Sequence, residues 1–99
     1  MKIKSVWTNK NTKQLSYVIS KISDEKTMQN FLRDVMTAKE IVEIASRLQA
    51  AKMLSEKINY AKVITSTKLS SRTVARISNW LKNGCKGYIE AIKIINSHR

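Results

Sequence analysis

Apolar residues recur at helical spacing along almost the whole chain, and no stretch alternates with the period of two that marks a strand. Proline is absent, and glycine occurs only at Gly84 and Gly87, so little interrupts this pattern. We therefore expect an all-α fold of about six helices. The spacing predicts helices at residues 10–21, 24–35, 38–55, 60–66 and 71–82, and a last one from Tyr88 to about Ile95.

The third expected helix has the clearest start signal. Thr37 and Glu40 stand in the N-cap and N3 positions of a capping box, and Met36 and Ile41 stand in the positions of a hydrophobic staple. From there to about residue 55 the helix is apolar around much of its circumference, more than a one-sided surface helix requires. In a chain of 99 residues this indicates a central helix that also packs against a second subunit, and hence a homodimer.

A helix-turn-helix is predicted at about residues 59–82. Asn59 can cap a helix of two turns, and Ser70 can cap a second helix of about three turns after a short connection. Leu69 and Val74 are again in the register of a hydrophobic staple.

The second helix of this pair, at 71–82, separates its residues into two faces. At about 100° per residue, the apolar side chains fall within roughly 60° of one another and the polar ones fall opposite. The inward residues are Val74, Ile77 and Leu81, and the outward residues are Arg72, Arg76 and Asn79.

The chain is strongly basic, with 19 Lys and Arg against 7 Asp and Glu, a net charge of +12. The excess is uneven. Residues 59–99 hold eight basic residues and one acid, whereas residues 31–58 hold five basic and four acidic residues. A basic lobe next to a nearly neutral segment indicates a polyanionic partner, and double-stranded DNA fits the predicted helix pair.

In a helix-turn-helix, the first residues of the second helix reach base edges in the major groove. Arg72 is the one best suited to bind guanine through two hydrogen bonds. The base-reading candidates are Ser71, Arg72, Thr73 and Arg76. The phosphate-binding candidates are Asn59, Lys62, Lys68, Ser70 and Asn79, through side chains or through the free amides of the two caps. A capped helix pair with a purely structural role would give a partial match to this motif, and the charge of 59–99 favours DNA.

Other chemistry has little support in the sequence. Cys85 is the single cysteine and forms no internal disulfide, and no apolar run approaches a membrane span or a signal peptide, so a soluble cytoplasmic protein is expected. His98 has no companion ligand, so no metal site is expected. No nucleophile–base set or phosphate loop is present, which excludes the common enzyme classes and leaves no cofactor. Residues 1–12 are polar and basic enough for a flexible arm, and we expect one domain over 1–99.

Four segments carry a family resemblance: NFLRDVMTAKEI, ASRLQAAKML, NYAKVI with LSSRTVARI, and LKNGCKGYIEAI. Together they span about residues 24–95 in order and nearly without gaps. This span resembles the Trp-repressor-like superfamily, and most closely its YerC/YecD-type branch. The resemblance implies an all-helical, intertwined homodimer in which each subunit carries a helix-turn-helix head, and the two heads read successive major grooves.

The resemblance also identifies positions of a corepressor pocket. Tryptophan-responsive members hold the amino acid between the central helix and the reading helix, and Thr37, Arg47 and Arg76 match positions of that pocket. However, Ile77 stands where those members have a glycine, and Trp80 stands where they have a serine. A branched side chain would project into the space of the indole, so the pocket is expected to be vestigial and L-tryptophan is not expected to be the effector.

The turn departs from the common helix-turn-helix pattern as well. Lys68 occupies the place of a frequent glycine, and Ile64 occupies the place of a small residue. Either Lys68 adopts a left-handed conformation or the turn differs slightly.

Three functions are compatible with these features. The leading one is a sequence-specific transcriptional regulator, most simply a repressor. The alternatives are a nonspecific nucleic-acid-binding protein of the nucleoid or of RNA, and a module whose helix pair binds protein.

Overall fold

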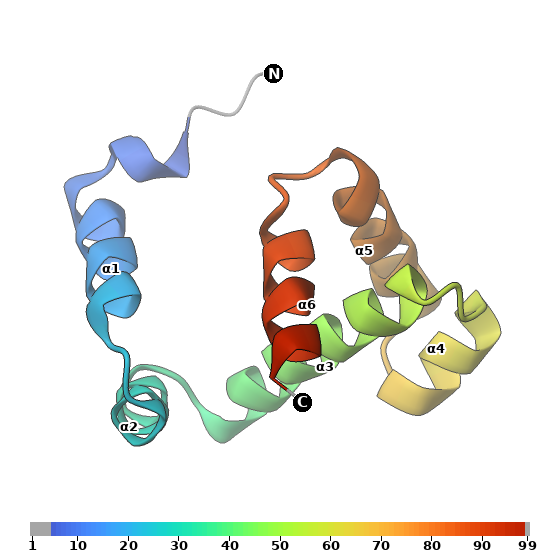
Figure 1. The fold of residues 1–99 in the computed structure, drawn as a ribbon, viewed down its shortest axis with the longest axis horizontal. Coiled ribbons are helices and arrows are strands. Elements are labelled where there is room, and N and C mark those ends of the chain that lie inside the picture. Colours follow the sequence, from blue (N-terminus) through green and yellow to red (C-terminus); the bar gives the residue numbers. More distant parts are fainter. Residues whose placement is uncertain (1–4, 99) are drawn as a thin grey trace. The chain divides into compact units, whose positions relative to one another are not determined.

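The computed structural model describes residues 5–98, and every regular element among them is helical (Figure 1). The all-α fold with six α-helices is thereby confirmed. The elements are η1 (a 3₁₀-helix, Val6–Thr8), α1 (Lys10–Lys21), α2 (Glu25–Val35), α3 (Ala38–Ser55), α4 (Tyr60–Thr67), α5 (Ser71–Asn83) and α6 (Gly87–Ser97).

The N-terminal end departs from expectation. Of the flexible arm expected at 1–12, residues 1–4 lie outside the described part, but the remainder is ordered as η1 and the first residues of α1, each preceded by a capping residue. The Ser5 hydroxyl accepts a hydrogen bond from the Trp7 amide at 3.1 Å and starts η1, and the Asn9 side chain caps α1. Helix α2 begins one residue later than expected, because Asp24 is its cap. The amide and hydroxyl of Thr27 both donate to this carboxylate and lower the pKa of Asp24.

The chain forms two compact units, Met1–Ala38 and Lys39–Arg99. In the first unit, α1 and α2 contain no buried residue, although both are amphipathic. Leu15 is 45% exposed and Val35 is 55% exposed. The single domain over 1–99 stays a prediction.

The second unit has a small core made from α3, α4, α5 and α6. Five of its side chains are completely buried, and two more are nearly so: Ala50, Ala51, Val63, Val74, Ile77, Met53 and Ile92. The contribution of α3 comes from its C-terminal half. In its N-terminal half, Val42 remains 64% exposed and Ile44 remains 52% exposed.

The connection between α4 and α5 has the left-handed residue that the sequence offered as one of two alternatives. Lys68 has φ 62° and ψ 19° at the C-cap of α4, and its amide donates to the Ile64 carbonyl at 2.8 Å. The turn then enters α5 through half-buried Leu69, which packs against the core.

Candidate nucleic-acid interface

Two side-chain caps set the starts of the helix pair, at the residues that the sequence predicted. The Asn59 side-chain oxygen accepts from the Lys62 amide at 2.9 Å, and the Ser70 hydroxyl accepts from the Thr73 amide at 3.1 Å. Each cap satisfies one of the amides that a helix leaves unpaired at its start.

The inward face of α5 is anchored firmly. Val74 and Ile77 are completely buried, and half-buried Leu81 packs beside them. Ala50 and Ala51 of α3 are also completely buried in this cluster. Buried residues of α5 and α3 thus share one core, and this shared burial restrains the rotation of α5.

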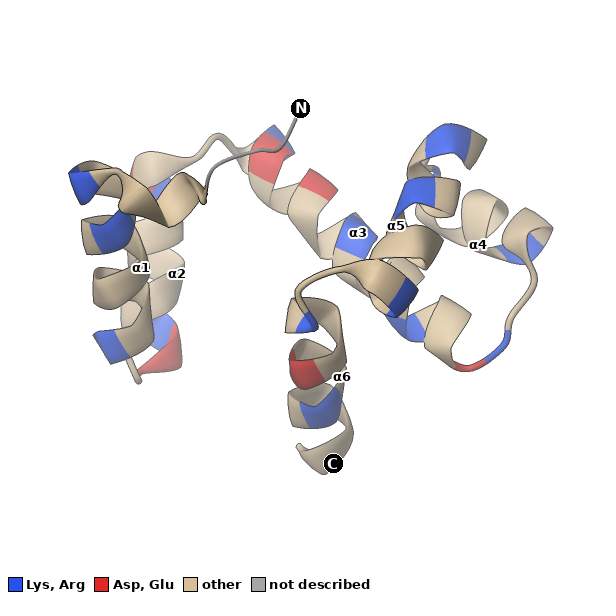
Figure 2. Ribbon diagram, turned by 90° about the horizontal axis from the view of Figure 1, so that it is seen from above, with Lys and Arg blue, Asp and Glu red and all other residues tan. Residues whose placement is uncertain are grey.

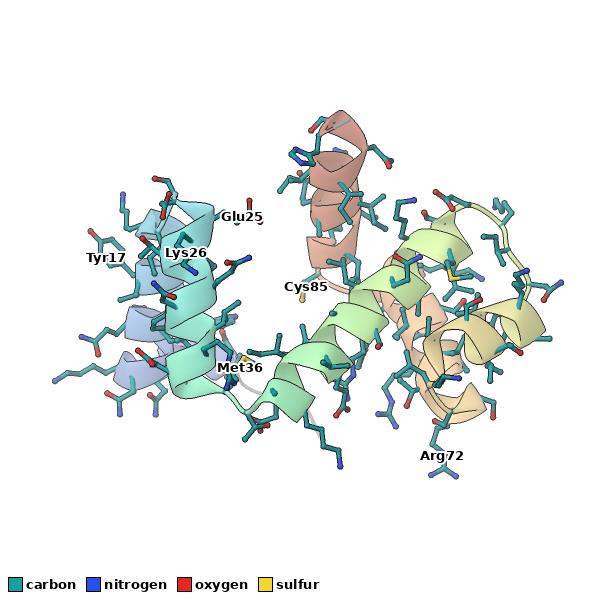
Figure 3. All side chains as sticks on the ribbon, turned by 90° about the horizontal axis from the view of Figure 1, so that it is seen from below. Tyr17, Glu25, Lys26, Met36, Arg72 and Cys85 are labelled. Carbon is teal, nitrogen blue, oxygen red and sulfur yellow. The ribbon has the colours of Figure 1, made fainter. Side chains whose placement is uncertain are left out.

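This anchoring turns a polar face outward. Arg72, Arg76 and Asn79 are all exposed, and Arg72 projects from α5 into solvent (Figure 3). Among the described residues, the three ion pairs lie elsewhere: Arg47–Glu43, Lys52–Glu56 and Lys93–Glu90. No carboxylate of this part of the chain therefore holds the two outward guanidinium groups.

The other two base-reading candidates lie at the start of α5. Ser71 is exposed. Thr73 is half-buried, and its hydroxyl accepts a hydrogen bond from the Ser70 hydroxyl at 3.0 Å. The sequence did not indicate this second bond of Ser70, which turns the Thr73 hydroxyl toward the cap.

The phosphate candidates are all exposed, and three of their side chains already have partners. The oxygens of Asn59 and Ser70 serve the caps, and the Asn79 oxygen accepts from the Asn83 amide group at 2.9 Å. Lys62 and Lys68 extend from α4 and its C-cap. Asn83 is a polar residue of the same outward face that sequence reasoning missed, although its position one turn after Asn79 could have indicated it.

All charged residues in the region of the helix pair are basic. Residues 57–89 contain seven basic residues and no acid: Lys57, Lys62, Lys68, Arg72, Arg76, Lys82 and Lys86. Figure 2 shows blue segments and no red along α4 and α5. Such a surface attracts a polyanion and offers it no repelling carboxylate.

A cavity of about 670 Å³ at the end of α5 is lined by Trp80 and by none of the other positions matched to a corepressor pocket. Ile77 is completely buried in the core cluster that also holds Ala50 and Ala51 of α3, whereas Trp80 is 40% exposed. Arg76 points outward, and Arg47 pairs with Glu43 at 2.8 Å. Thr37 belongs to the other unit.

Arg47 is held by packing as well as by its ion pair. Its Nε atom is buried and has no hydrogen-bond partner among the described residues. Its charge lies close enough to Tyr88 of α6 to lower the pKa of that phenol, but burial raises this pKa by more. The charge of Arg47 on α3 thus acts on Tyr88 of α6, a phenol whose pKa stays above its usual value.

Other kinds of site find no support among the described residues. No three His, Cys, Asp or Glu side chains come together there, and Cys85 is exposed. None of the described helices combines the length and the apolar character that crossing a membrane requires.

Known proteins share both the sequence and the fold. The family model for the Trp repressor protein matches residues 10–95. The uncharacterised protein YerC of Bacillus subtilis (strain 168) is 34% identical over 83 residues, which are 84% of this chain and 80% of YerC.

Two solved structures have the same fold. A TrpR-like protein from Eubacterium eligens ATCC 27750 superimposes with a TM-score of 0.85 at 27% identity, over 94% of this chain and 96% of its own. A Staphylococcus aureus protein superimposes with a TM-score of 0.83 at 23% identity, over 95% and 96%. The chain belongs to the Trp repressor protein family, a family of helix-turn-helix DNA-binding regulators.

Proposed function

We propose that this protein is a sequence-specific transcriptional repressor that inserts α5 into the major groove of double-stranded DNA. The proposal rests on the contrast between the buried face and the exposed face of α5. Val74 and Ile77 fix one face in the core with no exposure, while Arg72 and Arg76 stand exposed on the other face, free of ion pairs within the described residues. A helix suits base recognition when one of its faces is buried in the core and the other carries guanidinium groups without ion pairs.

Within the proposed interface, the start of α5 reads the bases. Arg72 binds a guanine through two hydrogen bonds, Arg76 reads one turn further along, and Ser71 donates or accepts at the first position. Thr73 contributes its methyl group, which suits contact with a thymine methyl, because its hydroxyl is bonded to Ser70.

Phosphate contacts position the head. Lys62 and Lys68 supply the charge, and the free amides that follow Asn59 and Ser70 point at phosphate oxygens. Asn79 donates from its amide nitrogen, since its oxygen is occupied by Asn83.

The active form in this proposal is a homodimer in the cytoplasm. The support is the apolar surface that one chain leaves uncovered, above all on α1, on α2 and on the N-terminal half of α3. Two heads related by symmetry would occupy two half-sites and cover a promoter, and repression follows most directly from such occupancy.

L-tryptophan does not control DNA binding in this proposal. Ile77 is completely buried in the core that it shares with Ala50 and Ala51 of α3, and forcing an indole in beside it would cost about 1–3 kcal/mol of overpacking. We expect no saturable heat in a calorimetric titration with L-tryptophan. Saturable binding together with tighter DNA binding would contradict this expectation.

One experiment separates the proposed function from its alternatives. Bound sequences are selected from a random duplex pool, and the affinity for the selected site and for a scrambled duplex is then measured against salt. A regulator should prefer its site by at least about 10³-fold. A steep salt dependence without preference would indicate a nonspecific nucleic-acid-binding protein. Weak binding to every duplex would indicate a protein-binding module.

A further inference from the structure

The acids of this chain are confined almost entirely to its middle, which leaves two long acid-free basic stretches, residues 1–23 and 57–89. Residues 24–56 hold six of the seven acids, together with five basic residues. The head lies in the acid-free stretch 57–89. The other stretch, residues 1–23, holds five lysines and no acid, and the proposed head makes no use of it.

Helix α1 presents part of this charge as an ordered surface. At about 100° per residue, Lys10, Lys13, Tyr17 and Lys21 project within about 80° of one another. Leu15 and Ile19 project on the opposite side. The basic face of α1, defined as Lys10, Lys13, Gln14, Tyr17 and Lys21, is exposed along its whole length. Figure 2 shows no acid on this helix.

The first turns of this face border a cleft. Thr8 of η1 joins four residues of the basic face, Lys10, Lys13, Gln14 and Tyr17, around a cleft of about 450 Å³. Tyr17 is 63% exposed and projects outward from α1 (Figure 3). The Lys21 ammonium lies 5.4 Å from the centre of the Tyr17 ring, a cation–π contact that keeps this cation beside the ring.

We propose that the basic face of α1 is a second nucleic-acid-binding surface, which binds the sugar–phosphate backbone of duplex DNA without reading its sequence. Lysine ammonium groups bind phosphates as point charges, and the tyrosine hydroxyl and the Gln14 amide can donate to the same oxygens. The amphipathic design supports this use, because the apolar side of α1 remains available for protein contacts while the basic side faces solvent. This inference rests on the proposed function for the identity of the polyanion.

An anionic membrane is the other polyanion that a basic amphipathic helix can bind. The position of the aromatic residue argues against it. A helix that lies in a membrane surface carries its large aromatic residues on the apolar side, whereas α1 carries Tyr17 among the lysines, on the side that would face water. DNA also accounts for both acid-free stretches of the chain with one partner.

The test compares two double variants of the full-length protein that remove the same charge. Lys10→Gln with Lys13→Gln removes two cations from the basic face of α1. Lys26→Gln with Lys39→Gln is the matched control, since both of these lysines are exposed and lie in the mixed-charge segment 24–56. Affinities for the selected site and for a scrambled duplex are measured from about 50 to 300 mM KCl, and circular dichroism checks the helix content.

We expect the α1 double variant to weaken binding to both duplexes by the same factor. The slope of log affinity against log salt should fall in magnitude by about 0.9 for each phosphate that the variant no longer neutralises, hence by up to about 1.8 per chain. The control should keep the wild-type slope. Equal slopes for the two double variants would overturn the inference.

Two further measurements keep the outcomes apart. If wild-type protein shows no preference for any selected site, the proposed function fails, but the slope on scrambled DNA still tests α1. Sedimentation with phosphatidylserine vesicles tests the membrane. If the α1 variant loses vesicle binding while it keeps the wild-type DNA slope, the basic face of α1 serves a membrane and the inference is wrong.

Discussion

At the scale of single residues, the three non-glycine residues with positive φ in the described part of the chain are all lysines. Lys57, Lys68 and Lys86 have φ values of 67°, 62° and 69°. Lys57 lies in the turn after α3, Lys68 is the C-cap of α4 and Lys86 is the N-cap of α6. A left-handed conformation costs an L-residue about 1–2 kcal/mol that glycine avoids. All three lie in the acid-free stretch 57–89, so the chain retains positive charge at turns where glycine would be more stable.

Lys68→Gly should therefore raise the free energy of unfolding by about 1 kcal/mol, because the strain at the C-cap of α4 is released. Lys62→Gly is the opposite control. It removes the same charge from the first turns of α4 and should lower stability by about 0.5–1 kcal/mol. Urea unfolding at one fixed protein concentration measures both, and a Lys68→Gly variant that is destabilised as much as Lys62→Gly would contradict this account.

The base-reading and phosphate-binding roles predict different effects of substitution. Arg72→Ala should cost about 1–3 kcal/mol at one base pair per half-site and relax sequence preference there. Lys68→Ala should weaken binding to all sequences alike and reduce the salt slope by about 1 per head. Quantitative binding to single-base variants of the selected site distinguishes them. Identical behaviour on matched and random duplexes would refute the assignment of α5 as the reading helix.

Helix-capping rules correctly predicted the two capping residues of the helix pair. The Asn59 and Ser70 caps follow from side chains that bond an amide three residues away, so the sequence contains all the necessary information. The second hydrogen bond between Ser70 and Thr73, from the Ser70 hydroxyl to the Thr73 hydroxyl, was not predictable in the same way. It depends on the rotamers that the Ser70 and Thr73 side chains adopt once the turn is formed. The DNA roles themselves remain predictions.

At the scale of elements, the end of α5 is fixed by a close approach of backbone to backbone. A Cβ atom at Gly84 would lie 2.5 Å from the Trp80 carbonyl oxygen, whereas one at Gly87 would meet no heavy atom within 4 Å. Gly87 is also the first residue of α6. The two glycines look equivalent in the sequence, and only the structure separates the required one from the replaceable one.

Gly84→Ala should destabilise the protein by about 1–3 kcal/mol, since the backbone must shift to accommodate the methyl group. Gly87→Ala should be neutral or should stabilise it by up to about 1 kcal/mol, because alanine favours a helix. Thermal unfolding of the two variants at equal concentration is the measurement. Equal melting temperatures would contradict the role given to Gly84.

Helix boundaries were predictable to within a residue or two wherever a cap and an apolar stripe coincide, as for α3, α4 and α5. Helix α2 was placed one residue early because Ser23 and Asp24 are both good caps in sequence. Element η1 was missed, since three residues are too few to show a helical period. Its cap is a local bond of Ser5 that a polar, basic segment gave no reason to expect.

At the scale of the whole molecule, the uncovered apolar surface is the main feature that one chain leaves unexplained. Val42 and Ile44 of α3 and Val35 of α2 are more than half exposed. The sequence predicted the part of this surplus that lies on α3, from the composition of helix 38–55, whereas Val35 was expected to face inward. The sequence could not predict the division into two compact units, because contacts between distant segments depend on packing that the helical period does not encode.

The homodimer proposal can be tested with a charged substitution at an exposed apolar position of α3. Val42→Glu changes an exposed position, so it should leave a true monomer intact, whereas in a dimer it would bury a charge and dissociate or unfold the protein. Ser66→Glu is the control at an exposed site on α4. Analytical ultracentrifugation at micromolar concentration should show a dimer for wild type and Ser66→Glu only. A folded wild-type monomer of 11.3 kDa would refute the proposal.

The confinement of the acids to residues 24–56 has a consequence for how two copies meet. Each copy carries +12, so two of them repel one another at long range. The exposed apolar residues Val35, Val42 and Ile44 lie in the one segment whose charges nearly cancel. Added salt would screen this repulsion and leave the apolar contact between the copies unchanged. Its cations would also compete with the protein for the phosphates of DNA. An increase in ionic strength should thus strengthen the association of two copies and weaken their binding to duplex DNA.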